Sequence, residues 1–272
     1  MSTFQGLPPG LVEFFTELQA DNSKAFWQAN KDRHEHDVRT PMRSLLAELS
    51  DEFGPLRLFR PNRDVRFSTD KSPYKLWTGA TSEAQAVGGI GYYLEISAKG
   101  VVTGYGAMLL APDQLRRYRA AIDDERSGAE FEELIDVLAA RSLPVSHGAE
   151  EPLKTAPRGY TADHPRIRHL RWKGAAVVQE WPKADWMHSS RTLDAIRRVW
   201  HGADPLKSWL SDSTAALSVD RLMTQLEMTT STELSGSGSS SMTPLRNCTF
   251  CTPALAALAR ARSSISSVMS TQ

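Results

Sequence analysis

The sequence has little cysteine and no excess charge. Only two of its 272 residues are cysteines, Cys248 and Cys251, so disulfide bonds cannot hold the larger part of the chain together. A structural zinc site needs four ligands, and this pair has no histidine nearby. We therefore expect no metal and no other cofactor. Lys plus Arg and Asp plus Glu both number 32, which excludes a uniformly basic nucleic-acid coat but leaves room for a local basic site.

Long apolar segments are also missing. No run of 18 apolar residues is present, so we expect no membrane-spanning helix and no membrane partner. The first six residues, Met-Ser-Thr-Phe-Gln-Gly, have neither the basic start nor the apolar stretch of a secretion signal. These absences predict a cytoplasmic protein.

Aromatic residues are scarce near the C-terminus. Of 22 aromatic residues, 21 precede residue 213, and only Phe250 follows it. The last 60 residues contain 22 Ser or Thr, and they include a Gly/Ser run over residues 235–241. A segment so poor in large apolar groups cannot offset the entropy cost of ordering. We predict a domain over residues 1–212 and a mostly disordered tail over residues 213–272, in which a short helix over residues 253–262 is the one element considered.

Within the domain, the hydrophobic period changes from helical to extended and back. Helices are predicted over residues 11–18, 24–37, from Thr40-Pro41 to 53, 113–123, 128–140, 190–201 and 205–210. Strands are predicted over residues 57–59, 64–68, 91–97 and 101–109, the last two as a β-hairpin, whereas residues 175–178 are ambiguous. This order predicts an α+β fold in which helices pack on a small antiparallel sheet.

A basic segment over residues 57–75 is the first candidate for chemistry. It contains six basic and two acidic residues, a local charge of +4. If residues 64–68 form a strand, period-two alternation puts Asp64, Arg66 and Ser68 on one polar face. That face would line the floor of a groove or pocket.

The same segment continues into a predicted tight turn at residues 70–73. Asp70 or Ser72 is able to bond to the backbone there, and Pro73 sets the backbone angle φ. Backbone N–H groups in such a turn, together with Lys71 and Lys75, would form a cradle for an anion. Tyr74 would offer a face for stacking.

A second basic segment covers residues 154–173 and has a local charge of +5. Arginine suits bidentate recognition of phosphate or carboxylate, so Arg158 is a candidate and Tyr160 would orient the ligand. The three arginines Arg166, Arg168 and Arg171 are instead predicted to form a solvated helix face. His164, beside Asp163, is the one histidine considered for acid–base work, although a helix-capping role for the Asp163–Pro165 stretch is the stronger interpretation.

We expect the two basic segments to converge on one hollow. The residues predicted to bind a ligand are Arg63, Asp64, Arg66, Ser68, Asp70, Lys71, Tyr74, Lys75, Arg158 and Tyr160. Asp64 or Asp70 would be the acid–base group if a reaction occurs, and no catalytic residue is assigned. The competing interpretation is an internal ion-pair network that holds the scaffold together and binds no ligand.

The domain resembles a family of conserved hypothetical proteins catalogued as domain of unknown function two-four-six-one. The resemblance rests on a thirteen-residue core, Arg-Asp-Val-Arg-Phe-Ser-Thr-Asp-Lys-Ser-Pro-Tyr-Lys, over residues 63–75. It extends through Gly91-Tyr-Tyr-Leu, Gly104-Tyr-Gly and Pro157-Arg-Gly-Tyr, and it covers about residues 4–212. The resemblance implies a domain boundary and no reaction, substrate or catalytic residue.

Three functions follow from these patterns. The first is a basic pocket for a small phosphate-bearing or nucleotide-like anion. The second is a nucleic-acid-binding domain that uses both basic segments, and the third is a non-catalytic interaction module. The sequence does not indicate whether the protein is an enzyme.

Overall fold

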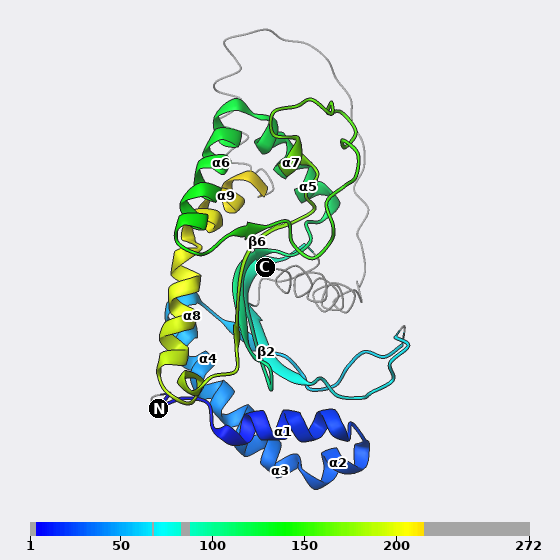
Figure 1. Ribbon diagram of the computed structural model, residues 1–272, viewed down its shortest axis with the longest axis vertical. Coiled ribbons are helices and arrows are strands. Elements are labelled where there is room, and N and C mark those ends of the chain that lie inside the picture. The colour runs from blue at the N-terminus through cyan, green and yellow to red at the C-terminus, as the bar shows by residue number, and fades with distance from the viewer. Residues whose placement is uncertain (1–3, 67, 83–87, 215–272) are drawn as a thin grey trace, which may run out of the picture.

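The computed structural model describes residues 4–66, 68–82 and 88–214 (Figure 1). The helices are α1 (Pro9–Ala20), α2 (Lys24–Ala29), α3 (Lys31–Arg33), the π-helix η1 (His34–Arg39), α4 (Thr40–Phe53), α5 (Pro112–Asp123), α6 (Glu125–Ala140), α7 (Ile167–Leu170), the 3-10 helix η2 (Asp185–His188), α8 (Arg191–Gly202) and α9 (Asp204–Thr214). The strands are β1 (Leu56–Leu58), β2 (Trp77–Ser82), β3 (Ile90–Ser97), β4 (Gly100–Ala107), β5 (Val145–Ser146) and β6 (Ala175–Pro182). Within this part of the chain the strands form one six-stranded sheet in the order β1-β2-β3-β4-β6-β5, and all neighbours are antiparallel. The predicted α+β fold is confirmed.

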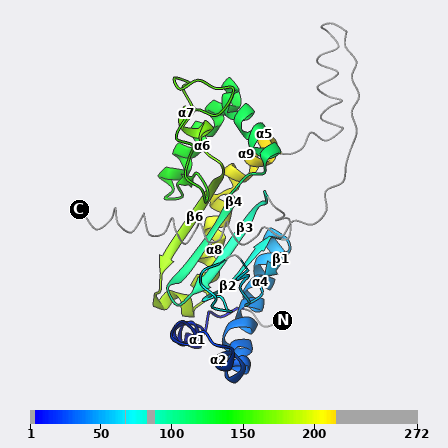
Figure 2. The same cartoon turned by 90° about the vertical axis from the view of Figure 1, so that its right-hand side faces the viewer.

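The sheet is strongly curved, and helices cover its outer side. Figure 1 shows α4 and α8 along the convex face, while none of the described helices lies against the concave face. The helices α1 and α2 lie at one end of the sheet, and α5, α6, α7 and α9 gather at the other end in both views (Figure 2). The two ends of the molecule are therefore built from different parts of the chain.

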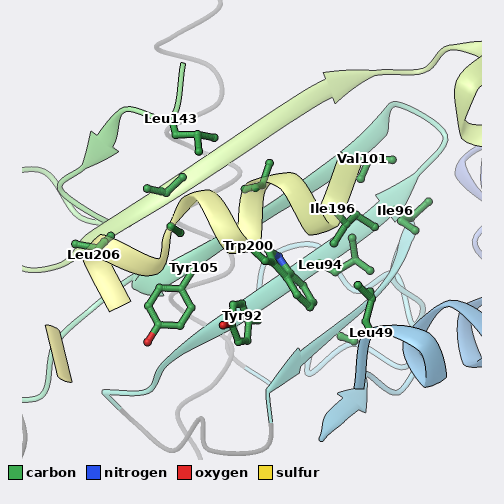
Figure 3. Close-up of a cluster of buried hydrophobic side chains, with 14 of the residues drawn as sticks. Leu49, Tyr92, Leu94, Ile96, Val101, Tyr105, Leu143, Ile196, Trp200 and Leu206 are labelled. Atoms are coloured by element: carbon green, nitrogen blue, oxygen red, sulfur yellow. The ribbon is translucent and has the colours of Figure 1, made fainter. Parts of the chain in front are cut away.

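The main core lies between α8 and the sheet. Trp200 of α8 is 1% exposed and stacks on Tyr92 at 4.6 Å between ring centroids (Figure 3). Its indole N–H donates to Thr103 Oγ1 at 2.8 Å, which satisfies the one polar atom of the buried ring. Leu94 and Ile96 of β3 point toward the same helix (Figure 3). This packing explains why the amphipathic pattern of residues 190–201 predicts a helix correctly.

The N-terminal helical region differs in detail from the prediction. The predicted helix over residues 24–37 is divided into α2, α3 and η1. The Thr40-Pro41 pair predicts an N-cap followed by a proline in the first turn of a new helix. Thr40 is not such a cap, because its backbone is helical (φ −64°, ψ −49°) and its N–H donates to Glu35 O, five residues back. The wider π turn accommodates Pro41, which has no N–H to donate. One continuous helical path therefore runs from Lys31 to Phe53.

The predicted strand over residues 64–68 is wrong. The described residues between β1 and β2 form an irregular loop, closed by a single bridge between Asn62 and Tyr74. Asp64 accepts from the Arg66 N–H at 3.2 Å, a local turn that competes with strand pairing. The predicted turn at residues 70–73 is confirmed in one respect, because Asp70 accepts from the Ser72 N–H at 2.9 Å.

The hairpin of β3 and β4 is confirmed, and the ambiguous residues 175–178 belong to strand β6. Helix α6 begins earlier than predicted, because Asp124 accepts from the Ser127 N–H and so caps the first turn. Helix α9 continues two residues past the predicted boundary at 212, and Thr214 is buried. The predicted short helix and the cysteine pair of the tail lie outside the described residues.

None of the helices in residues 4–66, 68–82 and 88–214 combines the length and the apolar character that crossing a bilayer requires.

Candidate functional site

The two predicted basic segments lie at opposite ends of the sheet. Tyr74 stacks on Trp27 of α2 at 4.1 Å, and its N–H donates to Asn22 Oδ1, so the 63–75 loop belongs to the N-terminal end. Tyr160 lies 6.2 Å from the His164 ring in the loop that leads into α7, at the other end (Figure 1). Eight predicted residues are therefore near one another, while Arg158 and Tyr160 are elsewhere. The expectation of one shared hollow is overturned.

The arginines of the 63–75 loop are engaged by acidic neighbours. Arg63 pairs with Asp70 at 2.5 Å, and Arg66 pairs with Asp64 at 2.6 Å. The hydrogen bond from Arg66 lowers the pKa of Asp64 to about 2, and hydrogen bonds from Ser72 and Arg63 lower that of Asp70 to about 2. Carboxylates this acidic make poor proton acceptors near neutral pH, so neither fits the acid–base role considered for it.

The lysines of this loop bind its own backbone. Lys71 Nζ donates to Val65 O at 2.9 Å. Lys75 Nζ donates to Arg60 O at 2.6 Å and to Asn62 O at 3.0 Å. Ser68 contributes a backbone N–H, 3.4 Å from Val65 O. These contacts hold the loop in shape and favour the scaffold interpretation for most of its charges.

Lys75 is the exception, because its ammonium also lies over aromatic rings. It is 5.4 Å from the centroid of Trp77 and 6.0 Å from that of Phe59. Burial, together with the nearby Arg60 charge, lowers the pKa of Lys75 to about 8 from 10.5.

We expect Lys75 to lose its proton near pH 8. The charge on Lys75 is present below pH 8 and is lost as the pH rises through that value. In a ¹³Cε NMR titration of lysine-labelled protein, one resonance should show a midpoint near pH 8 and should vanish in the Lys75→Arg variant. A midpoint of 10 or above for that resonance would contradict the assignment.

A second basic site lies at the α7 end. A hollow of about 390 Å³ is formed by β5, the chain after it and α7, and its lining includes Ser146, His147, Leu153, Arg168, Arg171 and Trp172. None of the described residues that line it is an Asp or Glu. We call this feature the α7 hollow.

Arg168 and Arg171 both line the α7 hollow. Neither has an acidic partner among the residues that the structure describes. The Nε atom of Arg171 is buried and has no hydrogen-bond acceptor within the same part of the chain. A buried donor without an acceptor is costly, and the guanidinium that contains it belongs to a residue that lines the hollow. The nearby Glu150 is paired with Lys173 at 2.6 Å.

The charge pattern of the sequence predicts a solvated helix face for Arg168 and Arg171. Their spacing of three residues puts them on the same side of a helical turn, which was the available signal. The same spacing is equally typical of an exposed basic face. Only the burial of the side chains distinguishes a ligand-binding pair of arginines from a solvated face. Arg166, in contrast, is neutralised by Glu132 at 3.1 Å.

His164 is oriented differently from the prediction. Its Nε2 lies 3.0 Å from Asp123 Oδ1, and its Nδ1 accepts from the Arg166 N–H at 3.0 Å. The orienting carboxylate is therefore Asp123 of α5, and the neighbour Asp163 does not take this part. The capping interpretation is also wrong, since α7 begins after Arg166. These contacts tie the loop to α5.

The described residues contain no cluster of three or more His, Cys, Asp or Glu side chains that could hold a metal ion.

Comparison with known proteins gives one match. Residues 10–209 match the model of a family described as a conserved hypothetical protein, DUF2461. No curated protein and no solved structure shows significant similarity. The matched region runs from the start of α1 to α9 and includes the 63–75 core on which the resemblance rests, so the resemblance is confirmed. The chain therefore belongs to the DUF2461 family of conserved hypothetical proteins.

Proposed function

We propose that the protein binds a small phosphate-bearing anion in the α7 hollow. The observation that carries the proposal is that Arg168 and Arg171 both line the hollow and that neither has an acidic partner among the described residues. Arginine is suited to phosphate because its planar fork donates two parallel hydrogen bonds.

The shape and lining of the hollow fit a small ligand. Its volume of about 390 Å³ is within the range of small-molecule sites. Leu153 and Trp172 offer apolar surface to the body of the ligand, and the arginines offer charge to its phosphate. His147 Nδ1 lies 2.9 Å from Glu150 O, so this nitrogen carries the proton and Nε2 is available to the hollow.

The proposal is limited to binding. It assigns no reaction, no catalytic residue and no cofactor, and a cytoplasmic location is kept as an expectation. Arg158 and Tyr160 lie in the loop between Leu153 and Ile167 of the lining and are not lining residues themselves, so they enter the proposal only as a further cation and a further ring that the loop could bring to the ligand. Of the predicted residues in the 63–75 loop, Lys75 enters the inference below, while the contacts of the others fit the scaffold interpretation.

The test is a ligand screen on the full chain. Thermal shift and calorimetry should show stabilisation by inorganic phosphate, ribose 5-phosphate or AMP, and none by adenosine, because linkage stabilises only the state that binds. Each charge-assisted hydrogen bond is worth about 1.5–3 kcal/mol, so Arg171→Ala should weaken the best ligand at least about tenfold. Arg168→Ala should act in the same direction.

The control is Arg141→Ala, which removes an exposed arginine at the end of α6. It should leave affinity unchanged. Arg158→Ala measures whether the loop adds a third cation. Equal binding of AMP by the wild type and by the Arg168→Ala/Arg171→Ala double variant would refute the proposal.

A further inference from the structure

Three aromatic side chains lie together on the concave face of the sheet. Leu94 and Ile96 point to Trp200 on the convex side (Figure 3). Side chains alternate along a strand, so Tyr93, which directly precedes Leu94, points to the other side. Trp77 of β2 lies opposite Ser97 of β3 in the register of the two strands. Ser97 and Tyr93 are four residues apart in β3 and therefore point to the same face, so Trp77 points to that face as well.

Phe59 completes the group from the end of β1. Its ring lies 5.6 Å from the Trp77 centroid and 6.4 Å from that of Tyr93. We call Phe59, Trp77 and Tyr93 the aromatic trio.

The aromatic trio is separate from the hydrophobic core. All three rings are half-buried, and none belongs to the core cluster or to the side chains packed against it within the described residues. Phe53 and Trp181, by comparison, are also half-buried but pack against that core. Core packing therefore does not explain three large rings on this face.

Positive charge surrounds the aromatic trio. Arg57 of β1 lies opposite Thr81 of β2, and Thr81 lies opposite Tyr93 of β3 in the register of the sheet. Arg57 is therefore on the same face as Tyr93, and it is exposed. Arg60 is also exposed, and its charge reaches Lys75. Across the described ranges, no carboxylate forms an ion pair with any of these three cations.

Two acidic groups share the concave face. Glu95 pairs with Gly79 in register, and its Oε2 accepts from the Tyr93 hydroxyl at 2.6 Å. Glu180 lies two strands away, opposite Val102. Asp64, the acidic group near Arg60, is paired with Arg66. The edge of the face around the aromatic trio therefore has an excess of positive charge.

We infer that this face binds single-stranded nucleic acid. Aromatic rings on the exposed side of an antiparallel sheet are platforms on which unpaired bases stack. The cations Arg57, Arg60 and Lys75 are placed to contact the phosphates between those bases. A duplex hides the faces of its bases, so this surface selects the single-stranded form.

This inference does not depend on the α7 hollow. The two sites lie at opposite ends of the sheet and use different residues (Figure 1). Variants at one site should therefore leave the other unaffected.

The first arm of the test uses the full chain and a 5′-fluorescein-labelled dT10 oligonucleotide. Fluorescence anisotropy should show binding that weakens with salt. Three phosphate contacts predict a log–log slope of about −2, from −0.7 for each contact on single strands. A hairpin duplex of equal charge should bind at least about tenfold more weakly. A duplex that binds as tightly as dT10 would overturn the inference.

The second arm uses variants of the aromatic trio. Phe59→Ala and Trp77→Ala should each weaken dT10 binding at least about fivefold, because each removes a stacking platform. Trp77→Phe should restore most of the affinity, since phenylalanine also stacks. Circular dichroism checks that each variant is folded. Wild-type affinity in a folded Phe59→Ala/Trp77→Ala variant would overturn the inference.

The third arm compares two double variants with the same loss of charge. Arg57→Ala/Arg60→Ala should reduce the slope to about −0.7, since two contacts are removed. Arg141→Ala/Lys154→Ala removes two exposed cations elsewhere and should leave the slope near −2. An equal loss in both double variants would mean that net charge alone binds the oligonucleotide, which would also overturn the inference.

Discussion

Replacing Trp200 by alanine is expected to lower the free energy of unfolding by about 3–5 kcal/mol, the usual cost of truncating a buried aromatic residue. The side chain is 1% exposed and has Tyr92 and Phe53 within 5.0 Å, measured between ring centroids. The variant also leaves Thr103 Oγ1 without the indole N–H. For a domain of this size, the Tm should fall by roughly 10 °C. Urea and thermal denaturation measure both quantities.

Two variants make the result specific. Trp200→Phe keeps a ring against Tyr92 but loses the hydrogen bond, so its cost should be clearly smaller than that of alanine. Val137→Ala, on α6 where the side chain is 37% exposed, should change stability by less than about 0.5 kcal/mol. If the Trp200→Ala protein had the same Tm as the Val137→Ala protein, the interface between α8 and the sheet would not be a main source of the stability of the fold.

Gly106→Ala is expected to be comparably harmful for a different reason. Gly106 has φ +141°, a conformation that side chains rarely adopt. An added Cβ would also lie 2.3 Å from Ala175 O and 2.5 Å from Ala176 Cα, both on the backbone of β6. Backbone strain and overpacking each cost about 1–3 kcal/mol, so the loss should be about 2–6 kcal/mol. Denaturant unfolding measures it.

The matched control is Gly54→Ala. Gly54 has φ +82°, but no atom lies within 4 Å of the added Cβ, so only the backbone strain applies. The Gly54→Ala variant should therefore lose less stability than Gly106→Ala.

Gly106→Ala should also weaken anion binding in the α7 hollow. It forces β4 and β6 apart, and Ser146 of β5, which lines the hollow, lies opposite Ala176 of β6. Equal stability of the two alanine variants would contradict the close approach of the strands.

The elements with strong local periodicity were predicted correctly. Helix α1 buries Leu11, Phe14 and Leu18, whose spacing alone indicates one apolar face. The hairpin of β3 and β4 was found because two extended runs flank a short turn. In both cases, neighbours in the sequence are also neighbours in the structure.

The elements that depend on distant partners were missed. Strand β2 contains Gly79 and small residues, and it is extended because β1 and β3 pair with it on both sides. The 63–75 loop has the alternation of a strand, but Asp64 bonds to the backbone two residues on and prevents ladder pairing. Such competition between local and long-range bonds is not visible in a pattern of polar and apolar residues.

The candidate sites divide in the same way. By itself, the sequence determined the α+β class, the family and the two clusters of positive charge, because composition and periodicity are local properties of the chain. Only the tertiary structure decided which charges are neutralised, that the clusters are apart, and that Arg171 and Lys75 are the cations to examine. The reason is physical: a charge is available to a ligand only if no folded neighbour satisfies it, and those neighbours come from distant segments as often as from adjacent ones.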